Sequence, residues 1–413
     1  IPIPFFQSHS MNVAVIKELY PGEHRVALVP AVVSTLVKAD HVVLVEHDAG
    51  IAAGFSNADY EKAGGKIVDR DEAFQAECVL TVRTCGAAGD AWASERKRMS
   101  SSSAIIGMAD PLGNCEACLA DAQTGATIYA LELVPRITRA QSMDVLSSQA
   151  NIAGYEAVLL GATALKKILP MMTTAAGTIR PAKALILGAG VAGLQAIATA
   201  KRLGAQVLAY DVRPAVKEQV ESLGAKFVEL DLETASTETK GGYAKAMSEE
   251  FYKKQQELLG KVLAECDLVV TTALIPGKPA PTLITKTMVE GMQPGSVIVD
   301  LAAERGGNCE MTTPGETVSF NNITILGPTN LPAEVATHTS QLYSKNIVTF
   351  LNHLIDCGFP HEVSDDEICR ETLVAHNGDI VHARVRDLAG MPQLSKESPE
   401  SSSPDSLSSP QSS

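Results

Sequence analysis

The chain has 413 residues, of which 45% are hydrophobic and 20% are charged, and its formal net charge is −14. A chain of this length usually forms two domains, each large enough to bury its own core. The acidic balance argues against a nucleic-acid partner and against a polybasic membrane anchor. No apolar run reaches the roughly 18 residues that a membrane-spanning helix requires, so no such helix is expected.

The first region, residues 11–146, alternates short apolar runs with helical or turn segments. Helical segments are expected at residues 30–39 and 71–76. This alternation predicts an α/β domain whose parallel sheet has helices on both faces. The expected strands are residues 13–16, 42–46, 79–82, 104–107 and 127–131.

The second region, residues 147–327, begins its sheet with a glycine motif. The apolar strand at 184–187 leads into Gly188, Gly190 and Gly193, which complete the pattern G-x-G-x-x-G before a helical segment. Six strands that open with this motif are typical of a dinucleotide-binding domain. The expected strands are residues 184–187, 206–210, 226–229, 268–272, 296–300 and 323–326.

Each part of the motif has a physical role. Gly188 permits a tight turn, Gly190 lets the backbone approach a pyrophosphate, and Gly193 lets helix and strand pack closely. Asp211 ends the next strand, where it can accept hydrogen bonds from a ribose 2′-hydroxyl and would repel a 2′-phosphate. This arrangement favours NAD(H) over NADP(H), and Arg213 is interpreted as a secondary adenosine contact or a surface residue. The alternative is a glycine-rich turn with an unrelated ligand.

Two polar stretches fall outside the strand pattern. Residues 231–250, which include Gly242 and Tyr243, are longer than an ordinary loop and are interpreted as a mobile flap, with disorder as the alternative. Residues 395–413 are rich in Ser and Pro and are expected to form a disordered tail or linker.

A late helix predicts that the first domain is discontinuous. The helix expected at residues 340–355 has no partner in a completed second sheet. We therefore expect residues 328–385 to return to the first domain. This helix and another at residues 151–169 would bridge a cleft between the two domains.

Residues 135–149 form a second candidate site at the expected domain junction. Arg136, Gln141 and Asp144 are polar groups in an otherwise apolar neighbourhood. An Arg can pair with an Asp, and a Gln amide can hydrogen-bond a carboxamide or a ribose hydroxyl. The alternative is a solvated interdomain loop that contains a structural ion pair.

The cysteine and histidine patterns predict no metal site. Cys115 and Cys118 form one C-x-x-C pair, whereas a zinc site needs four ligands. Ordinary thiols in a reducing compartment are therefore favoured. The nine histidines are dispersed along the sequence, and Asp300 and Glu304 are interpreted as shaping a loop at the cleft.

Several long runs resemble a known family. Over residues 12–354 the chain resembles the NAD(H)-binding component, domain I, of proton-translocating nicotinamide nucleotide transhydrogenase. The resemblance implies two Rossmann-like domains whose parallel sheets flank a cleft. The runs that carry it are residues 135–153 (PRITRAQSMDVLSSQANIA), 188–193 (GAGVAG), 211–214 (DVRP), 242–245 (GYAK), 271–281 (TTALIPGKPAP) and 296–309 (SVIVDLAAERGGNC).

The resemblance also implies roles for individual residues. Arg136, Gln141 and Asp144 would form the loop that holds the nicotinamide and poises it for hydride transfer. The implied nucleotide contacts, beside the three motif glycines, are Arg136, Ile137, Thr138, Arg139, Ala140, Ser147, Val191, Asp211, Val212, Arg213, Gly242, Tyr243, Ala273 and Leu274.

The partners are likewise implied by the resemblance. Hydride would pass between NADH on this chain and NADP⁺ on a separate domain III, without a covalent intermediate or a metal. In the family this transfer is coupled to proton passage through a membrane domain II. The resemblance further implies a homodimer at the peripheral, soluble face of a membrane complex, on the matrix side of the mitochondrial inner membrane or the bacterial cytoplasmic side.

Two alternatives remain. Alanine dehydrogenase shares the fold and the opening pattern at residues 17–28, where Arg25 matches the arginine that holds the substrate carboxylate. Arg83 stands where a Lys is expected, Glu304 stands where an Asp is expected, and Met108-Ala-Asp110 contains no His. Without a histidine to transfer protons near neutral pH, amino-acid oxidation is disfavoured. The other alternative is a non-catalytic NAD-binding module.

Overall fold

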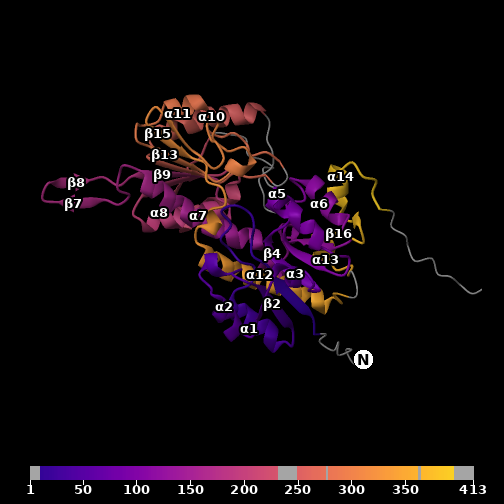
Figure 1. The fold of residues 1–413 in the computed structure, drawn as a ribbon. Helices are drawn as coiled ribbons and strands as arrows, with labels where there is room; N and C mark the ends of the chain where they lie inside the picture. Colours follow the sequence, from indigo (N-terminus) through magenta and orange to yellow (C-terminus); the bar gives the residue numbers. More distant parts are fainter. Residues whose placement is uncertain (1–9, 231–248, 276–277, 361–363, 395–413) are drawn as a thin grey trace, which may run out of the picture.

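The computed structural model describes residues 10–230, 249–275, 278–360 and 364–394. The predicted flap contacts Gly242 and Tyr243 and the predicted tail at 395–413 lie outside these residues. The described chain forms two large sheets with helices packed around each (Figure 1). Within the described ranges, every helix is too short or too polar to traverse a lipid bilayer.

The first sheet has eight strands in the order β17-β16-β6-β5-β4-β1-β2-β3. All five strands predicted here are present, and β3 was not predicted. The six N-terminal strands are parallel, as predicted for residues 11–146, whereas β16 and β17, which were not predicted, are antiparallel additions at one edge. The strands are β1 (Asn12–Val15), β2 (Val42–Glu46), β3 (Lys66–Val68), β4 (Cys78–Arg83), β5 (Ala104–Met108), β6 (Thr127–Ala130), β16 (Leu373–His376) and β17 (Asp379–Ile380).

The second sheet has seven strands in the order β11-β10-β9-β12-β13-β15-β14. The first six follow the doubly wound order, which reverses direction between β9 and β12, and ligands bind at that point in such sheets. All six predicted strands are present, and antiparallel β14 was not predicted. The strands are β9 (Lys183–Leu187), β10 (Gln206–Tyr210), β11 (Lys226–Phe227), β12 (Leu268–Thr271), β13 (Val297–Asp300), β14 (Thr317–Phe320) and β15 (Ile323–Leu326).

Two long helices connect the sheets. Helix α7 (Val145–Ala164) starts in the core of the first sheet at Val145 and reaches the core of the second at Val158. It begins six residues before the predicted start, because Asp144 caps its first turn, and it ends five residues before the predicted end. Helix α12 (Ala336–Asp356) buries Tyr343 and Phe350 in the first core, among N-terminal elements (Figure 1).

Helix α12 and strands β16 and β17 thus lie with the first sheet, although they follow the second in the sequence. The boundaries 11–146 plus 328–385 and 147–327 stay a prediction. The remaining α-helices are α1 (Pro30–Lys38), α2 (Asn57–Lys62), α3 (Arg70–Ala73), α4 (Cys85–Ala88), α5 (Asp90–Ala93), α6 (Cys115–Ala122), α8 (Val191–Arg202), α9 (Lys217–Ser222), α10 (Glu249–Leu263), α11 (Lys286–Glu290), α13 (Glu367–Thr372) and α14 (Ala383–Leu388).

A hairpin of strands β7 (Met172–Thr174) and β8 (Gly177–Ile179) projects from the second sheet (Figure 1). It pairs with neither large sheet. All six of its strand residues are exposed, including apolar Met172 and Ile179. The sequence did not predict this hairpin.

Candidate nucleotide site between the two sheets

A cleft of about 1280 Å³ lies between the two sheets. One wall comes from the loops that follow β4, β5 and β6, including residues 131–136. The other comes from the loops that follow β9, β10 and β12, including residues 188–192 and 211–213. The cleft therefore lies at the carboxyl ends of parallel strands, where α/β sheets bind ligands.

The glycine motif forms the turn from β9 into α8. Gly188 has a φ of 97°, which favours glycine, and it starts the turn out of the strand. A Cβ at Gly193 would lie 1.8 Å from the carbonyl oxygen of Gly188, so only glycine fits there. A Cβ at Gly190 would meet nothing within 4 Å, and Gly190 lines the cleft. The open space over Gly190 is where a pyrophosphate could approach the backbone.

Asp211 fixes this turn to β10. Its Oδ2 accepts a 2.7 Å hydrogen bond from the amide of Ala189, and its Oδ1 accepts one from the amide of Arg213 at 2.9 Å. The Arg213 guanidinium also donates to Asp211, through Nε at 2.9 Å and Nη2 at 2.8 Å. The Arg213 side chain is only 12% exposed, so its interpretation as a surface residue is wrong.

The predicted nicotinamide loop contains the 3₁₀ helix η4 (Thr138–Met143), which is anchored to the first core. Ala140 and Met143 are buried in the first core, and Asp144 caps α7 by accepting from the amide of Ser147 at 2.8 Å. Arg136 is exposed and lines the cleft. The loop is therefore held rigidly while Arg136 faces the cleft.

The structure brings most of the predicted contacts into one cleft, but not all of them. Residues 137–141 do not line the cleft: Gln141 is exposed, and Arg139 pairs with Asp366 at 2.7 Å. Gly193 packs inside the turn rather than facing the cleft. The predicted residues that line the cleft are Arg136, Asp144, Ser147, Gly188, Gly190, Val191, Asp211, Val212, Arg213, Ala273 and Leu274.

Two polar features of the cleft were missed by sequence analysis. The Glu132 carboxylate accepts from the amides of Ala109 and Asp110, and among the described residues its other oxygen has no hydrogen-bond partner. Burial raises the pKa of Glu132 to about 7. Arg305 of the second sheet pairs with Asp110 of the first at 2.6 Å. Glu132 belongs to no recognisable motif, and although Arg305 lies in the run 296–309, its partner Asp110 is 195 positions away, so no local pattern marks the pair.

Arg25 is enclosed by protein groups away from the cleft lining. Its Nε and Nη2 donate to the two carboxylate oxygens of Glu23, at 2.7 and 2.6 Å. Its Nη1 donates to Gln149 at 2.8 Å, and Nη2 also reaches Asn330 at 3.0 Å. Although burial opposes ionisation, the Arg25 guanidinium lowers the pKa of Glu23 to about 2. The Glu23 carboxylate thus occupies the Arg25 guanidinium, which would have to bind the substrate carboxylate if the chain acted as an alanine dehydrogenase.

Comparison with known proteins agrees with this architecture. The family model described as "Alanine dehydrogenase/PNT, N-terminal domain" matches residues 14–153, and the corresponding C-terminal model matches residues 157–383. The chain is 48% identical over 377 residues to an NAD(P) transhydrogenase subunit alpha chain of Rhodospirillum rubrum, covering 90% of this chain and 98% of the relative. It is 29% identical to an alanine dehydrogenase of Halomonas elongata, over 92% and 97% of the two chains.

Solved structures give the same result. A transhydrogenase from Sinorhizobium meliloti superposes with a TM-score of 0.78 at 44% identity, covering 90% of this chain and 99% of that one. An L-alanine dehydrogenase superposes with a TM-score of 0.77 at 27% identity, covering 92% and 99%. The predicted fold of two Rossmann-like domains is confirmed. The chain belongs to the alanine dehydrogenase/PNT family, and among these relatives it is more similar to the transhydrogenases.

Proposed function

We propose that this chain is the NAD(H)-binding component of a proton-translocating transhydrogenase, and that it passes hydride between NADH and NADP⁺ held on a separate domain III. The observation that carries the proposal is the convergence of the glycine turn, Asp211, Arg136 and Asp144 on one cleft. The 48% identity to a transhydrogenase alpha subunit supports the same interpretation.

The residues present fit a bound dinucleotide. Gly190 caps helix α8, whose first amides and positive dipole end face the cleft over the open space described above. Ala273 and Leu274 follow β12 and line the cleft beside the turn. Asp211 follows β10 and lines the cleft, and a carboxylate at this position of the fold would accept hydrogen bonds from a ribose 2′-hydroxyl, which would favour NAD(H) over NADP(H). When bound, NAD(H) supplies the hydride, and the protein supplies orientation.

Arg136, Gln141 and Asp144 would then position the nicotinamide. Asp144 holds the loop by capping α7, and Arg136 extends from that loop into the cleft. Gln141 faces solvent rather than the cleft of this chain. That exposure suits a group that orients a ring toward an acceptor carried by another polypeptide, because the acceptor must approach from outside. Holding two rings at reacting distance is a large part of catalysis in such transfers.

The partners follow from the same proposal. A membrane domain II would couple hydride transfer to proton passage, and this chain would lie at the peripheral face of that complex. A second copy of the chain would form a homodimer. The projecting β7–β8 hairpin supports dimerisation, since its neighbour Met171 is 67% exposed and its strands carry the exposed side chains of Met172 and Ile179.

An alanine dehydrogenase-like activity is the second candidate, and the 0.77 TM-score to that enzyme favours it. Two features of this chain oppose it. The donors of Arg25 are occupied by Glu23, Gln149 and Asn330. No His follows β5, where the chain reads Met108-Ala-Asp110. At these described positions the chain thus offers neither a free carboxylate-binding arginine nor the proton-transferring histidine.

The test combines binding with two reactions. NADH and NADPH fluorescence are titrated against the purified chain, and reduction of an NADP⁺ analogue is then followed with and without a separately purified transhydrogenase domain III. We expect preferential NADH binding and hydride transfer only when domain III is present. NADH oxidation by pyruvate and ammonia alone would support the alanine dehydrogenase alternative. Binding with neither reaction would leave a non-catalytic NAD-binding module, and indifference to NADH would overturn the proposal.

A further inference from the structure

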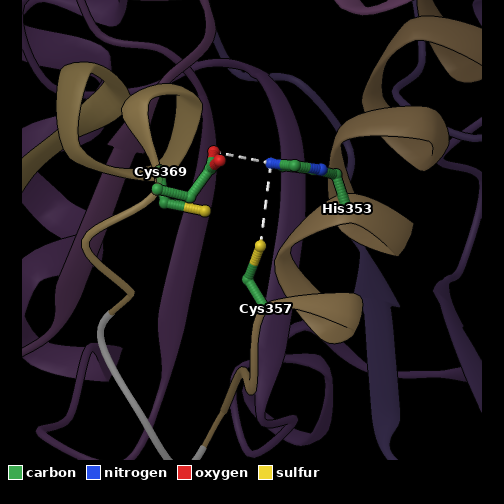
Figure 2. A group of neighbouring side chains, drawn as sticks. His353, Cys357 and Cys369 are labelled. Carbon is green, nitrogen blue, oxygen red and sulfur yellow. Dashed lines mark hydrogen bonds and ion pairs between the residues drawn. The ribbon is translucent and has the colours of Figure 1, made fainter. Parts of the chain in front are cut away.

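A cluster of four side chains lies away from the cleft, where α12 ends and α13 begins. His353 and Cys357 lie one turn apart on or just beyond α12, Asp366 caps α13, and Cys369 lies within α13. One ligand atom from each lies within 4.8 Å of the others. Figure 2 shows His353, Cys357 and Cys369 pointing toward a common space from the two elements.

We propose that His353, Cys357, Asp366 and Cys369 form a tetrahedral zinc site. Two thiols, an imidazole and a carboxylate are donors that Zn²⁺ accepts, and the soft sulfur donors select against Ca²⁺ and Mg²⁺. Cys357 Sγ lies 3.7 Å from His353 Nε2. In a tetrahedral site with ordinary zinc bond lengths these two atoms are separated by about 3.6 Å. Two of the donors are therefore already at ligand spacing.

Asp366 has one oxygen for the metal and one for a supporting contact. Its Oδ1 faces His353 Nε2 at 2.8 Å and accepts from the amide of Ile368 at 2.9 Å, and its Oδ2 accepts from Arg139 Nη1 at 2.7 Å. Coordination through Oδ1 would replace the hydrogen bond to His353 and leave the Arg139 contact in place. Such second contacts orient metal ligands in known sites.

The local charge also suits a divalent ion. Two thiolates and one carboxylate carry one more negative charge than Zn²⁺ neutralises, and Arg139 supplies a positive charge beside Asp366. The three ligands other than Cys369 are only partly buried, so the ion has a path from solvent.

The proposed site would be structural rather than catalytic. Four protein ligands leave no open position for a substrate or a reacting water. The ion would join the end of α12 to α13 and, through Asp366 and Arg139, to the loop that carries Gln141. None of its four ligands lines the cleft, so metal binding can be tested separately from the proposed hydride transfer.

The test uses Co²⁺ as a spectroscopic probe of the full chain, reduced and stripped with a chelator. We expect one Co²⁺ per chain, with the visible bands of a tetrahedral ion and a thiolate charge-transfer band, both lost when Zn²⁺ is added. Cys357→Ser and Cys369→Ser should each weaken binding by about tenfold or more. Cys115→Ser, which changes another partly exposed cysteine, should bind like the wild type. Because Cys357 is only partly buried, its variant is expected to fold even if the Cys369 variant does not.

Two results would overturn the proposal. One is a wild-type chain that binds Co²⁺ and Zn²⁺ no more tightly than the folded Cys357→Ser variant. The other is formation of a Cys357–Cys369 disulfide under mild oxidation that proceeds equally with or without added Zn²⁺, since a bound ion would protect both thiolates. A circular dichroism spectrum of each variant establishes that it is folded before its metal binding is compared.

Discussion

One carboxylate engages two arms of a buried guanidinium: Glu23 Oε2 lies 2.6 Å from Arg25 Nη2, and Glu23 Oε1 lies 2.7 Å from Arg25 Nε. Both side chains are almost fully buried. Removing one partner of such a pair leaves an uncompensated charge and costs about 3–5 kcal/mol. We therefore expect Glu23→Gln to lower the free energy of unfolding by that amount in urea titrations near neutral pH. Glu61→Gln, at an exposed position, is the control.

The same pair predicts a pH dependence. The pKa of Glu23 is lowered from 4.5 to about 2 in the folded protein, so its stabilising contribution is present above pH 4.5. That contribution is lost as the pH falls from 4.5 toward 2. The difference in unfolding free energy between wild type and Glu23→Gln should therefore narrow over this window. A difference that stays constant with pH would contradict the assignment of the charged pair.

Glu132 predicts a pH dependence of stability opposite in sign to that of Glu23. Burial raises its pKa from 4.5 to about 7, so the folded state holds an extra proton between these values and stability falls as the pH rises through them. Glu132→Gln keeps an oxygen for the amides of Ala109 and Asp110 and removes the buried charge. We expect it to raise the free energy of unfolding by about 1–3 kcal/mol above pH 7, with little change below pH 4.5. Glu257→Gln, at an exposed helix position, is the control and should leave the free energy of unfolding unchanged at both pH values.

Much of the fold could be predicted because its signals are local. The apolar runs of the parallel strands and the glycine turn at residues 188–193 each lie within a few neighbouring residues. The antiparallel edge strands were missed although their turns carry a signal. Asn377 and Gly378 between β16 and β17 both have positive φ, as do Asn321 and Asn322 between β14 and β15. Such pairs mark two-residue hairpins, so these strands could have been predicted.

The residues of the candidate site likewise include some that local spacing predicts and others that only the tertiary structure brings together. Gly190 and Asp211 were found from spacing because one turn and two adjacent strands place them together. The Asp110–Arg305 ion pair joins residues 195 positions apart, and only tertiary structure brings them together. The four residues of the proposed zinc site form two close pairs in the sequence, 353 with 357 and 366 with 369, but only the structure shows that the two pairs meet. Long-range contacts such as Asp110–Arg305 depend on packing and could not be predicted from local pattern.

Two glycines of one turn should respond differently to the same substitution. The added methyl group of Gly190→Ala would meet no protein atom, so we expect unchanged thermal stability. The same methyl group would occupy the space proposed for a pyrophosphate, so we expect NADH to bind at least about tenfold more weakly. Gly193→Ala places a Cβ 1.8 Å from the Gly188 carbonyl oxygen, so we expect a clear loss of thermal stability. Melting temperature and NADH titration separate the two effects. Normal NADH affinity in Gly190→Ala would contradict the proposed pyrophosphate site.

The β7–β8 hairpin predicts a self-association surface. We expect the wild-type chain to sediment as a dimer and the double substitution Met172→Asp and Ile179→Asp to shift it to a monomer, since buried charges oppose association. Thr173, which is exposed on the same strand, offers a control through Thr173→Ser. Sedimentation at several protein concentrations measures the shift. A wild-type monomer, or a dimer that persists in the charged variant, would exclude the hairpin as the interface.

Gln141 offers the sharpest test of the proposed hydride transfer, because it is exposed and does not line the cleft of this chain. Gln141→Asn shortens the side chain by one methylene and keeps its amide, so NADH affinity should stay within about a few fold of the wild type. A ring that is less well positioned should slow transfer to an acceptor on domain III by about tenfold or more, at least ~1.4 kcal/mol. Single-turnover transfer measures this rate, and Gln75→Asn, at a remote exposed position, is the control. Transfer at the wild-type rate would remove Gln141 from the mechanism, whereas a parallel loss of NADH affinity would make it a binding residue rather than a positioning one.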